Sequence, residues 1–149
     1  MTFIICHFKH CMKNYYRIIL GKKHESFDES RKGNFVGISF LEKIDFSNEL
    51  MTYTEFSTKF VPIYLELYPN APKPAAALAS GMLWRFVNLL QIGDIVFCPD
   101  GKGSYHVGEI SSNYQYRKDS SLPHTREVTW HSKTLPRTEM SKQLRNSLG

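Results

Sequence analysis

Residues 95–110 have the sequence IVFCPDGKGSYHVGEI, which predicts a β-hairpin. Ile95 to Cys98 form a short apolar run typical of a buried strand, and Tyr105 to Ile110 return as its partner. The five residues from Pro99 to Gly103 are rich in types that tolerate the positive φ of a tight turn. An antiparallel sheet is therefore expected in the C-terminal half of the chain.

Outward from this hairpin, the pattern alternates short strands with helices. We expect, from the N-terminus, strand 15–20, helix 26–32, strand 34–40, helix 54–67, helix 75–90, alternating residues 114–116, strand 126–131 and helix 138–147. Thr54 is the expected N-cap of helix 54–67, Pro62 is expected to kink or split that helix, and Pro74 suits the first turn of the next one. Gly37 indicates a bulge or the close approach of a ligand to the backbone. These elements favour an α+β fold, a small, mainly antiparallel β-barrel flanked by helices.

The composition suits one globular domain with basic ends. The chain has 149 residues, of which 42% are hydrophobic, enough for a core and too many for a disordered chain. Residues 1–33 hold seven Lys and Arg against three Asp and Glu, and residues 114–149 hold the same numbers, within a net charge of +5. This skew favours a polyanionic partner, and a solvated basic surface explains it equally well. No apolar stretch approaches the ~20 residues that span a bilayer, so no membrane partner is expected.

The first eleven residues differ from the rest because they show no periodicity. We expect a disordered N-terminal extension over residues 1–11 and the domain over 12–149, with Met12 as an alternative start. The apolar run in residues 3–6 is too short for a signal peptide, so a cytoplasmic protein is the default. Cys6-His7 and His10-Cys11 resemble half of a zinc site, but no second pair follows at finger spacing. No metal and no cofactor are predicted.

The sequence contains no convincing catalytic motif, and we predict that the chain is not an enzyme. Asp100 followed by Glu109 is similar to the acidic pattern of restriction nucleases, but that pattern ends Glu-x-Lys and Ser111 stands where the Lys belongs. Lys102 is not followed by the Ser or Thr of a phosphate-binding P-loop. There is no Gly-x-Ser-x-Gly elbow, and Cys98 lies in an apolar strand rather than a reactive setting.

A series of short motifs resembles the N-terminal domain of Mrr-like restriction endonucleases. The matching segments are Tyr15–Lys23, Gly33–Gly37, Phe60–Tyr64, Gly81–Trp84, Ile92–Val96, Val107–Ile110, Tyr114–Tyr116, Leu122–Arg126, Val128–Trp130 and Pro136–Ser141. The resemblance covers residues 12–149. It implies a PUA-like fold of the EVE and YTH kind, in which related domains recognise a modified base by flipping it into an aromatic pocket. It also implies a nuclease domain, C-terminal or separate, as a partner.

Under this resemblance the chain binds modified double-stranded DNA and directs a restriction nuclease to it. Aromatic rings would wall the base pocket, and backbone groups would contact the base edge. The expected base-pocket residues are Phe35, Gly37, Ser39, Phe40, Trp84 and Tyr114. The expected phosphate-binding residues are Lys22, Lys23, Arg117, Lys118, Arg126 and Arg137. Relatives often carry a Trp where this chain has Ser39-Phe40, and a Phe still stacks but lacks the indole N–H.

Three alternatives stay open. PUA-like folds also serve RNA recognition, so the chain could be a stand-alone RNA-binding module. The same pocket could take a small nucleotide-like ligand. A nucleic-acid hydrolase is the third alternative, and the missing Glu-x-Lys argues against it. Trp84 and Trp130 also fit a purely structural role, since buried aromatic residues dominate small cores.

Overall fold

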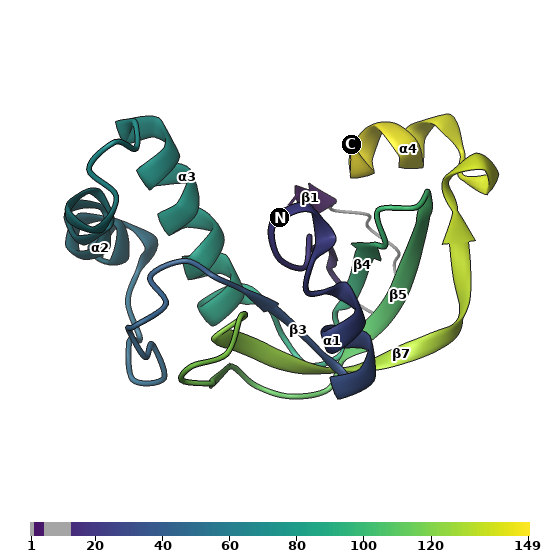
Figure 1. The fold of residues 1–149 in the computed structure, drawn as a ribbon, viewed down its shortest axis with the longest axis horizontal. Helices are drawn as coiled ribbons and strands as arrows, with labels where there is room; N and C mark the ends of the chain where they lie inside the picture. The colour runs from purple at the N-terminus through teal and green to yellow at the C-terminus, as the bar shows by residue number, and fades with distance from the viewer. Residues whose placement is uncertain (1, 5–12) are drawn as a thin grey trace.

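A strongly curled sheet organises the molecule. The computed structural model describes residues 2–4 and 13–149. The strands are β1 (Thr2–Ile4), β2 (Tyr15–Arg17), β3 (Phe35–Ile38), β4 (Ile95–Pro99), β5 (Ser104–Ile110), β6 (Gln115–Tyr116) and β7 (His124–Pro136). They follow the order β1-β2-β4-β5-β7-β3, with β6 paired to β7 (Figure 1). The sheet curls into a half-barrel. It is a mixed sheet, because β2 and β4 are parallel whereas the other described pairs are antiparallel.

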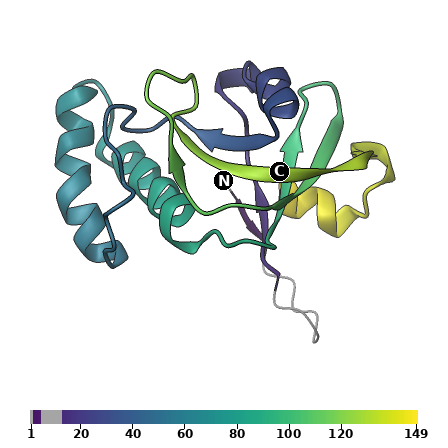
Figure 2. The same ribbon diagram turned by 90° about the horizontal axis from the view of Figure 1, so that it is seen from below.

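Four α-helices flank this sheet. They are α1 (Phe27–Gly33), α2 (Tyr53–Leu67), α3 (Lys73–Trp84) and α4 (Lys142–Leu148), with short 3-10 turns η1 (Lys22–His24) and η3 (Arg137–Glu139) and a π-helical turn η2 (Arg85–Leu89). Helices α2 and α3 lie at one end of the molecule and α4 at the other (Figures 1 and 2). The predicted α+β class is therefore confirmed, and the mainly antiparallel barrel is found as a curled half-barrel.

The hairpin predicted at residues 95–110 is confirmed as β4 and β5. Its turn contains Gly101 and Gly103, both at positive φ, and the Asp100 carboxylate accepts the backbone N–H groups of Lys102 at 2.7 Å and Ser104 at 3.0 Å. Strand β7 extends over residues 124–136, beyond both ends of the predicted 126–131. Its first half pairs with β3 and β6 and its second half with β5, so it connects the two parts of the sheet (Figure 2).

Helix α2 corrects two predictions. Thr52, not Thr54, is the N-cap, because Thr52 and Glu55 form a complete capping box: Oγ1 of Thr52 accepts the Glu55 N–H, and the Glu55 carboxylate accepts the Thr52 N–H at 2.9 Å. The helix is not split at Pro62, since α2 runs unbroken from Tyr53 to Leu67 and the buried Phe56 and Phe60 hold the turns before the proline against the core.

The other predicted helices differ in their bounds. Helix α3 begins at Lys73 with Pro74 in its first turn, as predicted, but α-helical geometry ends at Trp84 and residues 85–89 form a π-helical turn. The last helix is shorter than predicted, because Ser141 caps α4 by accepting the Leu144 N–H at 3.1 Å. Met140 precedes this helix in extended backbone, yet it is buried in one cluster with Leu148, and Leu144 packs against that cluster.

The buried side chains of the described residues form two clusters, and the larger one, rich in aliphatic and aromatic residues, is the main core. Tyr16, Ile18 and Leu20 alternate into this core from the N-terminal strand, although regular pairing of β2 ends at Arg17. Trp84 and Trp130 pack against it as partly buried residues. Cys98 is free and buried, and burial raises the pKa of its thiol, which leaves it an inert core residue.

The expected extension over residues 1–11 lies outside the described residues except for β1, which pairs with β2. The Cys6-His7 and His10-Cys11 pairs also lie outside them. Within residues 2–4 and 13–149, no helix is long and apolar enough to cross a membrane.

Candidate nucleic-acid interface

An apolar hollow of about 290 Å³ opens where β3 ends. We call it the apolar hollow, and its walls are Ile18, Ile19, Gly21, Lys22, Ile38, Ser39, Phe40 and Met82. Aliphatic side chains from the N-terminal strand and α3 form most of its surface, and Lys22 and Ser39 supply its polar side-chain groups. The apolar hollow thus offers a dry surface of the kind that holds a flat ring, with few groups to fix its orientation.

Two backbone segments position this hollow. The Ile18 N–H donates to the Phe97 carbonyl at 3.0 Å, which carries the N-terminal strand alongside β4 beyond the end of regular pairing. Beyond Ile38 the chain leaves the sheet and runs to α2 as residues 39–52, which we call the strap. Leu41 adopts a φ of 51°, a left-handed conformation uncommon outside glycine, and this turns the strap away from β3.

A buried histidine holds the strap in place. His124, at the start of β7, is fully buried and bonds through both ring nitrogens. Its Nε2 lies 2.7 Å from the Phe40 carbonyl, which can only accept, so Nε2 carries the proton. Its Nδ1 lies 2.8 Å from the Tyr114 hydroxyl, which therefore donates to it. The Phe46 N–H in turn donates to the Tyr114 oxygen at 3.4 Å.

These hydrogen bonds keep His124 neutral and fix the strap at Phe40, Glu42 and Phe46. Burial lowers the pKa of His124, against the raising effect of its backbone hydrogen bonds. Burial also raises the pKa of Tyr114 well above its ordinary value, so its hydroxyl stays protonated. The Tyr116 hydroxyl donates to the Glu42 carbonyl at 2.8 Å. Side chains of β6 and β7 and the residue before β6 therefore hold the strap that walls the apolar hollow.

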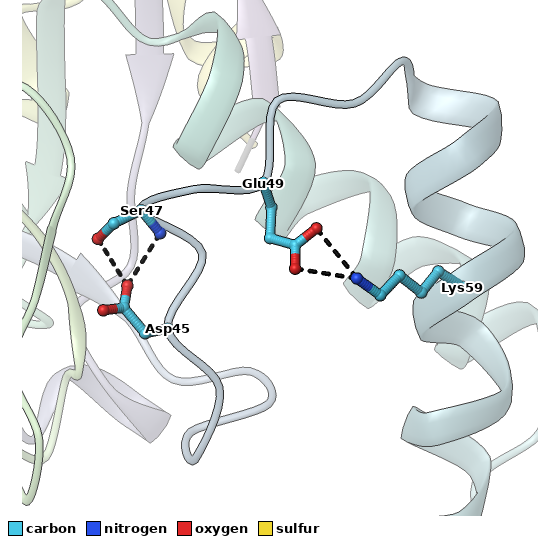
Figure 3. A network of polar contacts seen from close by, with 4 residues as sticks. All are labelled: Asp45, Ser47, Glu49 and Lys59. Carbon is cyan, nitrogen blue, oxygen red and sulfur yellow. Dashed lines mark hydrogen bonds and ion pairs between the residues drawn. The ribbon is translucent and has the colours of Figure 1, made fainter.

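Polar contacts also order the far part of the strap (Figure 3). The Asp45 carboxylate accepts the Ser47 N–H at 2.9 Å and the Ser47 hydroxyl at 2.6 Å. Both carboxylate oxygens of Glu49 contact the Lys59 ammonium of α2, at 2.9 and 3.1 Å. The strap is thus tied to the sheet at one end and to α2 at the other.

The structure brings two of the six expected base-pocket residues together at the apolar hollow, namely Ser39 and Phe40. Phe35 is buried beneath the Arg117 guanidinium, 4.7 Å from its ring centre. A Cβ at Gly37 would lie 2.8 Å from the His124 carbonyl oxygen, so this glycine admits β7 rather than a ligand. The expectation of a ligand approaching Gly37 is therefore corrected.

The remaining two expected pocket residues support the frame. Trp84 packs edge-on against Tyr53, and its indole N–H donates to the Met51 carbonyl at 2.9 Å. Tyr114 is committed to the network with His124. Neither residue is among the walls of the apolar hollow. Both act on it indirectly, because both bind the strap or the residues that hold it.

Four of the expected phosphate-binding residues come from two loops that both adjoin α1, and we call these two loops the basic edge. Lys22 and Lys23 precede α1, and Arg117 and Lys118 follow β6. The loop after β6 is tied to α1, because the Ser121 hydroxyl donates to the Glu29 carboxylate at 2.9 Å. Arg137 lies elsewhere, beside α4, where its Nη1 donates to the Gly149 carbonyl at 2.8 Å.

Arg126 is a structural residue, which corrects its predicted role as a phosphate contact. Only 3% of its surface is exposed. Its guanidinium donates to the carbonyls of Phe86 at 3.0 Å and Val87 at 2.9 Å in the π-helical turn, and to Ser112 at 3.3 Å. Burial lowers its pKa to about 10, so it is still charged at neutral pH. A cation on the last carbonyls of a helix is a favourable cap, and this explains why an arginine is buried here.

Several residues at the site were not predicted from the sequence. Ile18, Ile19 and Met82 wall the apolar hollow. Their apolar character suited a core strand and a helix face, and nothing in their spacing distinguished a wall from a core. Nothing in the spacing of the histidines distinguished His124, and only its two hydrogen bonds identify it as the support of the strap.

Fold and site together define a small α+β domain with a curled half-barrel sheet and an apolar hollow beside a basic edge. Residues 16–148 match a family model described as Domain of unknown function (DUF8426). The match spans most of the chain, and the chain belongs to that family. No curated protein and no solved structure matches it significantly. Among the described residues, no group of three or more His, Cys, Asp and Glu side chains could hold a metal ion.

Proposed function

We propose that this domain recognises a modified base in double-stranded DNA by holding the flipped base in the apolar hollow, and that it directs a restriction nuclease to that DNA. The observation that carries the proposal is the juxtaposition of Phe40, Ser39 and Lys22 at one hollow. An aromatic ring for stacking, a hydroxyl for the base edge and a cation for the adjoining phosphate are the groups that such recognition needs. A PUA-like fold of the EVE and YTH kind is part of the same proposal.

The arrangement of the basic edge supports the proposal. Phosphate contacts position a protein on the duplex, and contacts to the base provide specificity. Lys22 lines the apolar hollow, Lys23 follows it, and Arg117 and Lys118 lie in the loop whose Ser121 hydroxyl donates to Glu29 of α1. Extrusion of a base costs a few kcal/mol, which stacking worth ~1–3 kcal/mol and new hydrogen bonds would offset.

Titration of matched duplexes tests the proposal. Duplexes that differ only in one base, unmodified, 5-methylcytosine or N6-methyladenine, are titrated at one salt concentration, together with the corresponding single-stranded RNA. We expect one modified duplex to bind at least about tenfold more tightly than the unmodified one, on the scale of a single stacked base. Equal affinity for every duplex contradicts the proposal, and tighter binding of RNA replaces it with the RNA-binding alternative.

A blocking variant locates the binding site. Ile19 is 40% exposed at the wall of the apolar hollow, so Ile19→Trp fills the hollow with little strain on the core. Leu78→Trp is the matched control, because Leu78 is 61% exposed on α3 and does not line the hollow. Ile19→Trp should abolish the preference for the modified duplex, and Leu78→Trp should leave it unchanged. A preference that survives Ile19→Trp places the base elsewhere.

A further inference from the structure

A second hollow, of about 620 Å³, adjoins the turn that lines the apolar hollow. Gly21 and Lys22 face the apolar hollow, and the next two residues, Lys23 and His24, face the second one. We call it the histidine hollow, and its walls are Lys23, His24, Phe27, Asp28, Asp100, Gly101, Lys102 and His106. These residues come from the turn before α1, from the start of α1 and from the β4–β5 hairpin. The fold thus joins segments about eighty residues apart.

The two imidazoles are held firmly at this hollow. Lys23 and His24 have φ values of 56° and 66°, which are uncommon for residues other than glycine. The His24 ring lies against Gly101, where an added Cβ would come within 3.0 Å of His24 Cδ2. The His106 ring packs edge-on against Phe27, with 4.8 Å between ring centres. Both rings are therefore fixed by packing rather than by hydrogen bonds.

Each imidazole carries a buried nitrogen without a partner. Nδ1 of His24 and Nδ1 of His106 are buried and have no hydrogen-bond partner among the described residues. Buried polar atoms in native proteins are nearly always hydrogen-bonded, so two unpartnered nitrogens in the walls of one hollow distinguish these rings from the hydrogen-bonded His124. The exposed side chains of Lys23 and Lys102 place two cations at the rim of the same hollow.

The carboxylates of the hollow differ in availability. Asp100 is used by its own turn, since it accepts the N–H groups of Lys102 and Ser104. Burial alone would raise the pKa of Asp100, but these hydrogen bonds and the nearby His106 outweigh burial and lower it. Asp28 is exposed at the start of α1 and is the carboxylate that opposes an anion here. Its charge therefore provides a direct test of what the hollow binds.

We propose that the histidine hollow is a phosphate-binding subsite, in which Lys23, Lys102 and the imidazoles of His24 and His106 hold the phosphate next to the base in the apolar hollow. This inference rests on the proposed function, which identifies the phosphate as part of a DNA backbone. The lysines supply charge, and the imidazoles supply N–H donors of fixed direction. The turn Gly21–Glu25 would then separate a base from its neighbouring phosphate, which explains why residues on this one turn line both hollows.

Titration with inorganic phosphate tests the histidine hollow by itself. The imidazole C–H resonances of His24 and His106 are followed by NMR as sodium phosphate is added at constant ionic strength. We expect saturable shifts in both rings. Lys102→Gln should weaken binding ~2–5-fold and Asp28→Asn should strengthen it by a similar factor, the scale of one exposed charge. Lys73→Gln at the start of α3 is the matched control and should leave binding unchanged. Absence of saturation, or equal effects of the three variants, overturns the inference.

The pH dependence of phosphate binding provides a second readout. His106 faces Asp100, Lys102 and Asp28 in the hollow and Arg31 of α1, and His24 faces Lys23 and Gly101. Protonation of the His106 ring adds positive charge, so binding of dimethyl phosphate, a diester that keeps one negative charge throughout, should tighten as the pH falls from 7.5 to 5.5. Replacement of His106 by Gln should reduce this pH dependence. Binding of the diester that is independent of pH in the native chain contradicts a role for the His106 imidazole.

A duplex experiment separates this inference from the proposed function. Lys102→Gln should weaken the modified and the unmodified duplex by the same factor, because a phosphate contact carries no base information. If phosphate binds but all duplexes bind equally, the histidine hollow stands and base recognition fails. If the modified duplex is preferred but Lys102→Gln changes neither affinity, base recognition stands and the histidine hollow is not a phosphate subsite.

Discussion

The strap and the histidine hollow contain imidazoles in opposite situations. His124 beneath the strap bonds through both nitrogens, and Arg126 nearby donates to three carbonyls. His24 and His106 each keep a buried Nδ1 without a partner among the described residues. A satisfied buried network stabilises one backbone arrangement, whereas an unsatisfied one costs free energy until a ligand or water completes it. The first is thus a frame, and the second is a place for a ligand.

The largest expected effect of this difference is on Arg126. Arg126→Met should lower the free energy of unfolding by ~3–4 kcal/mol, because three carbonyls lose their buried donor. Urea denaturation measures the loss. Arg117→Met on the basic edge should cost less than ~1 kcal/mol, as exposed substitutions usually do. Equal losses in the two variants would show that Arg126 does not hold the π-helical turn.

His124 and His106 provide the direct comparison of the two situations. His124→Leu should lower the free energy of unfolding by ~2–3 kcal/mol, since the Phe40 carbonyl and the Tyr114 hydroxyl both lose a partner. His106→Leu removes an Nδ1 atom that has no hydrogen-bond partner among the described residues, so the change in the free energy of unfolding should lie within ~1 kcal/mol of zero. Urea denaturation measures both variants, and similar losses of the free energy of unfolding in His124→Leu and His106→Leu would contradict the distinction between frame and ligand site.

Phe40 tests whether the strap serves recognition as well as stability. Phe40→Ala should weaken binding of the modified duplex ~5–150-fold, the value of ~1–3 kcal/mol for one stacked base, and bring it near that of the unmodified duplex. Binding of inorganic phosphate at the histidine hollow should not change. Fluorescence anisotropy measures the first and NMR the second. A uniform loss on both duplexes would assign Phe40 to folding alone.

Acid should lower the stability of the fold and strengthen anion binding at the histidine hollow. Burial lowers the pKa of both His124 and His106, so the unfolded chain binds more protons than the folded chain below the ordinary histidine value of about 6.5. The free energy of unfolding should therefore fall as the pH drops through that value. The decrease should be smaller than the loss caused by Arg126→Met or by His124→Leu. Binding of dimethyl phosphate, whose single negative charge does not change over this interval, should tighten at the histidine hollow as His106 is protonated. Thermal melts with and without dimethyl phosphate measure both effects, and a melting temperature independent of pH would contradict the assignment of neutral rings.

Local patterns predicted the elements well where the interactions are local. The turn chemistry of Pro99 to Gly103 predicted the hairpin, whose strands pair as β4 and β5. The N-cap of α2 was misplaced by two residues, because Thr52 and Thr54 are both suitable caps and only the reciprocal bonds with Glu55 select Thr52. The predicted ends of an element were wrong where pairing with a strand remote in sequence determines them. An example is β7, whose length depends on pairing with β3 and β5.

The candidate site was predictable only in part. Aromatic and basic residue types were visible in the sequence, and Lys22, Ser39 and Phe40 do meet at one hollow. Phe35, Trp84, Tyr114 and Arg126 have the same residue types but are used inside the frame. A side chain able to stack or to bind phosphate is also able to pack or to cap a helix. Composition cannot separate these uses.

The sequence alone determined the α+β class, the hairpin at residues 95–110 and the basic ends, because these depend on local periodicity, turn residues and charge. Only the tertiary structure decided which polar groups are already satisfied. Curling of the sheet brings His124 to the Phe40 carbonyl 84 residues away, and Arg126 to Phe86 40 residues away. It also leaves two imidazole nitrogens beside a hollow without partners in the described chain. Hydrogen-bond satisfaction depends on distances between segments remote in sequence, and those distances exist only once the chain has folded.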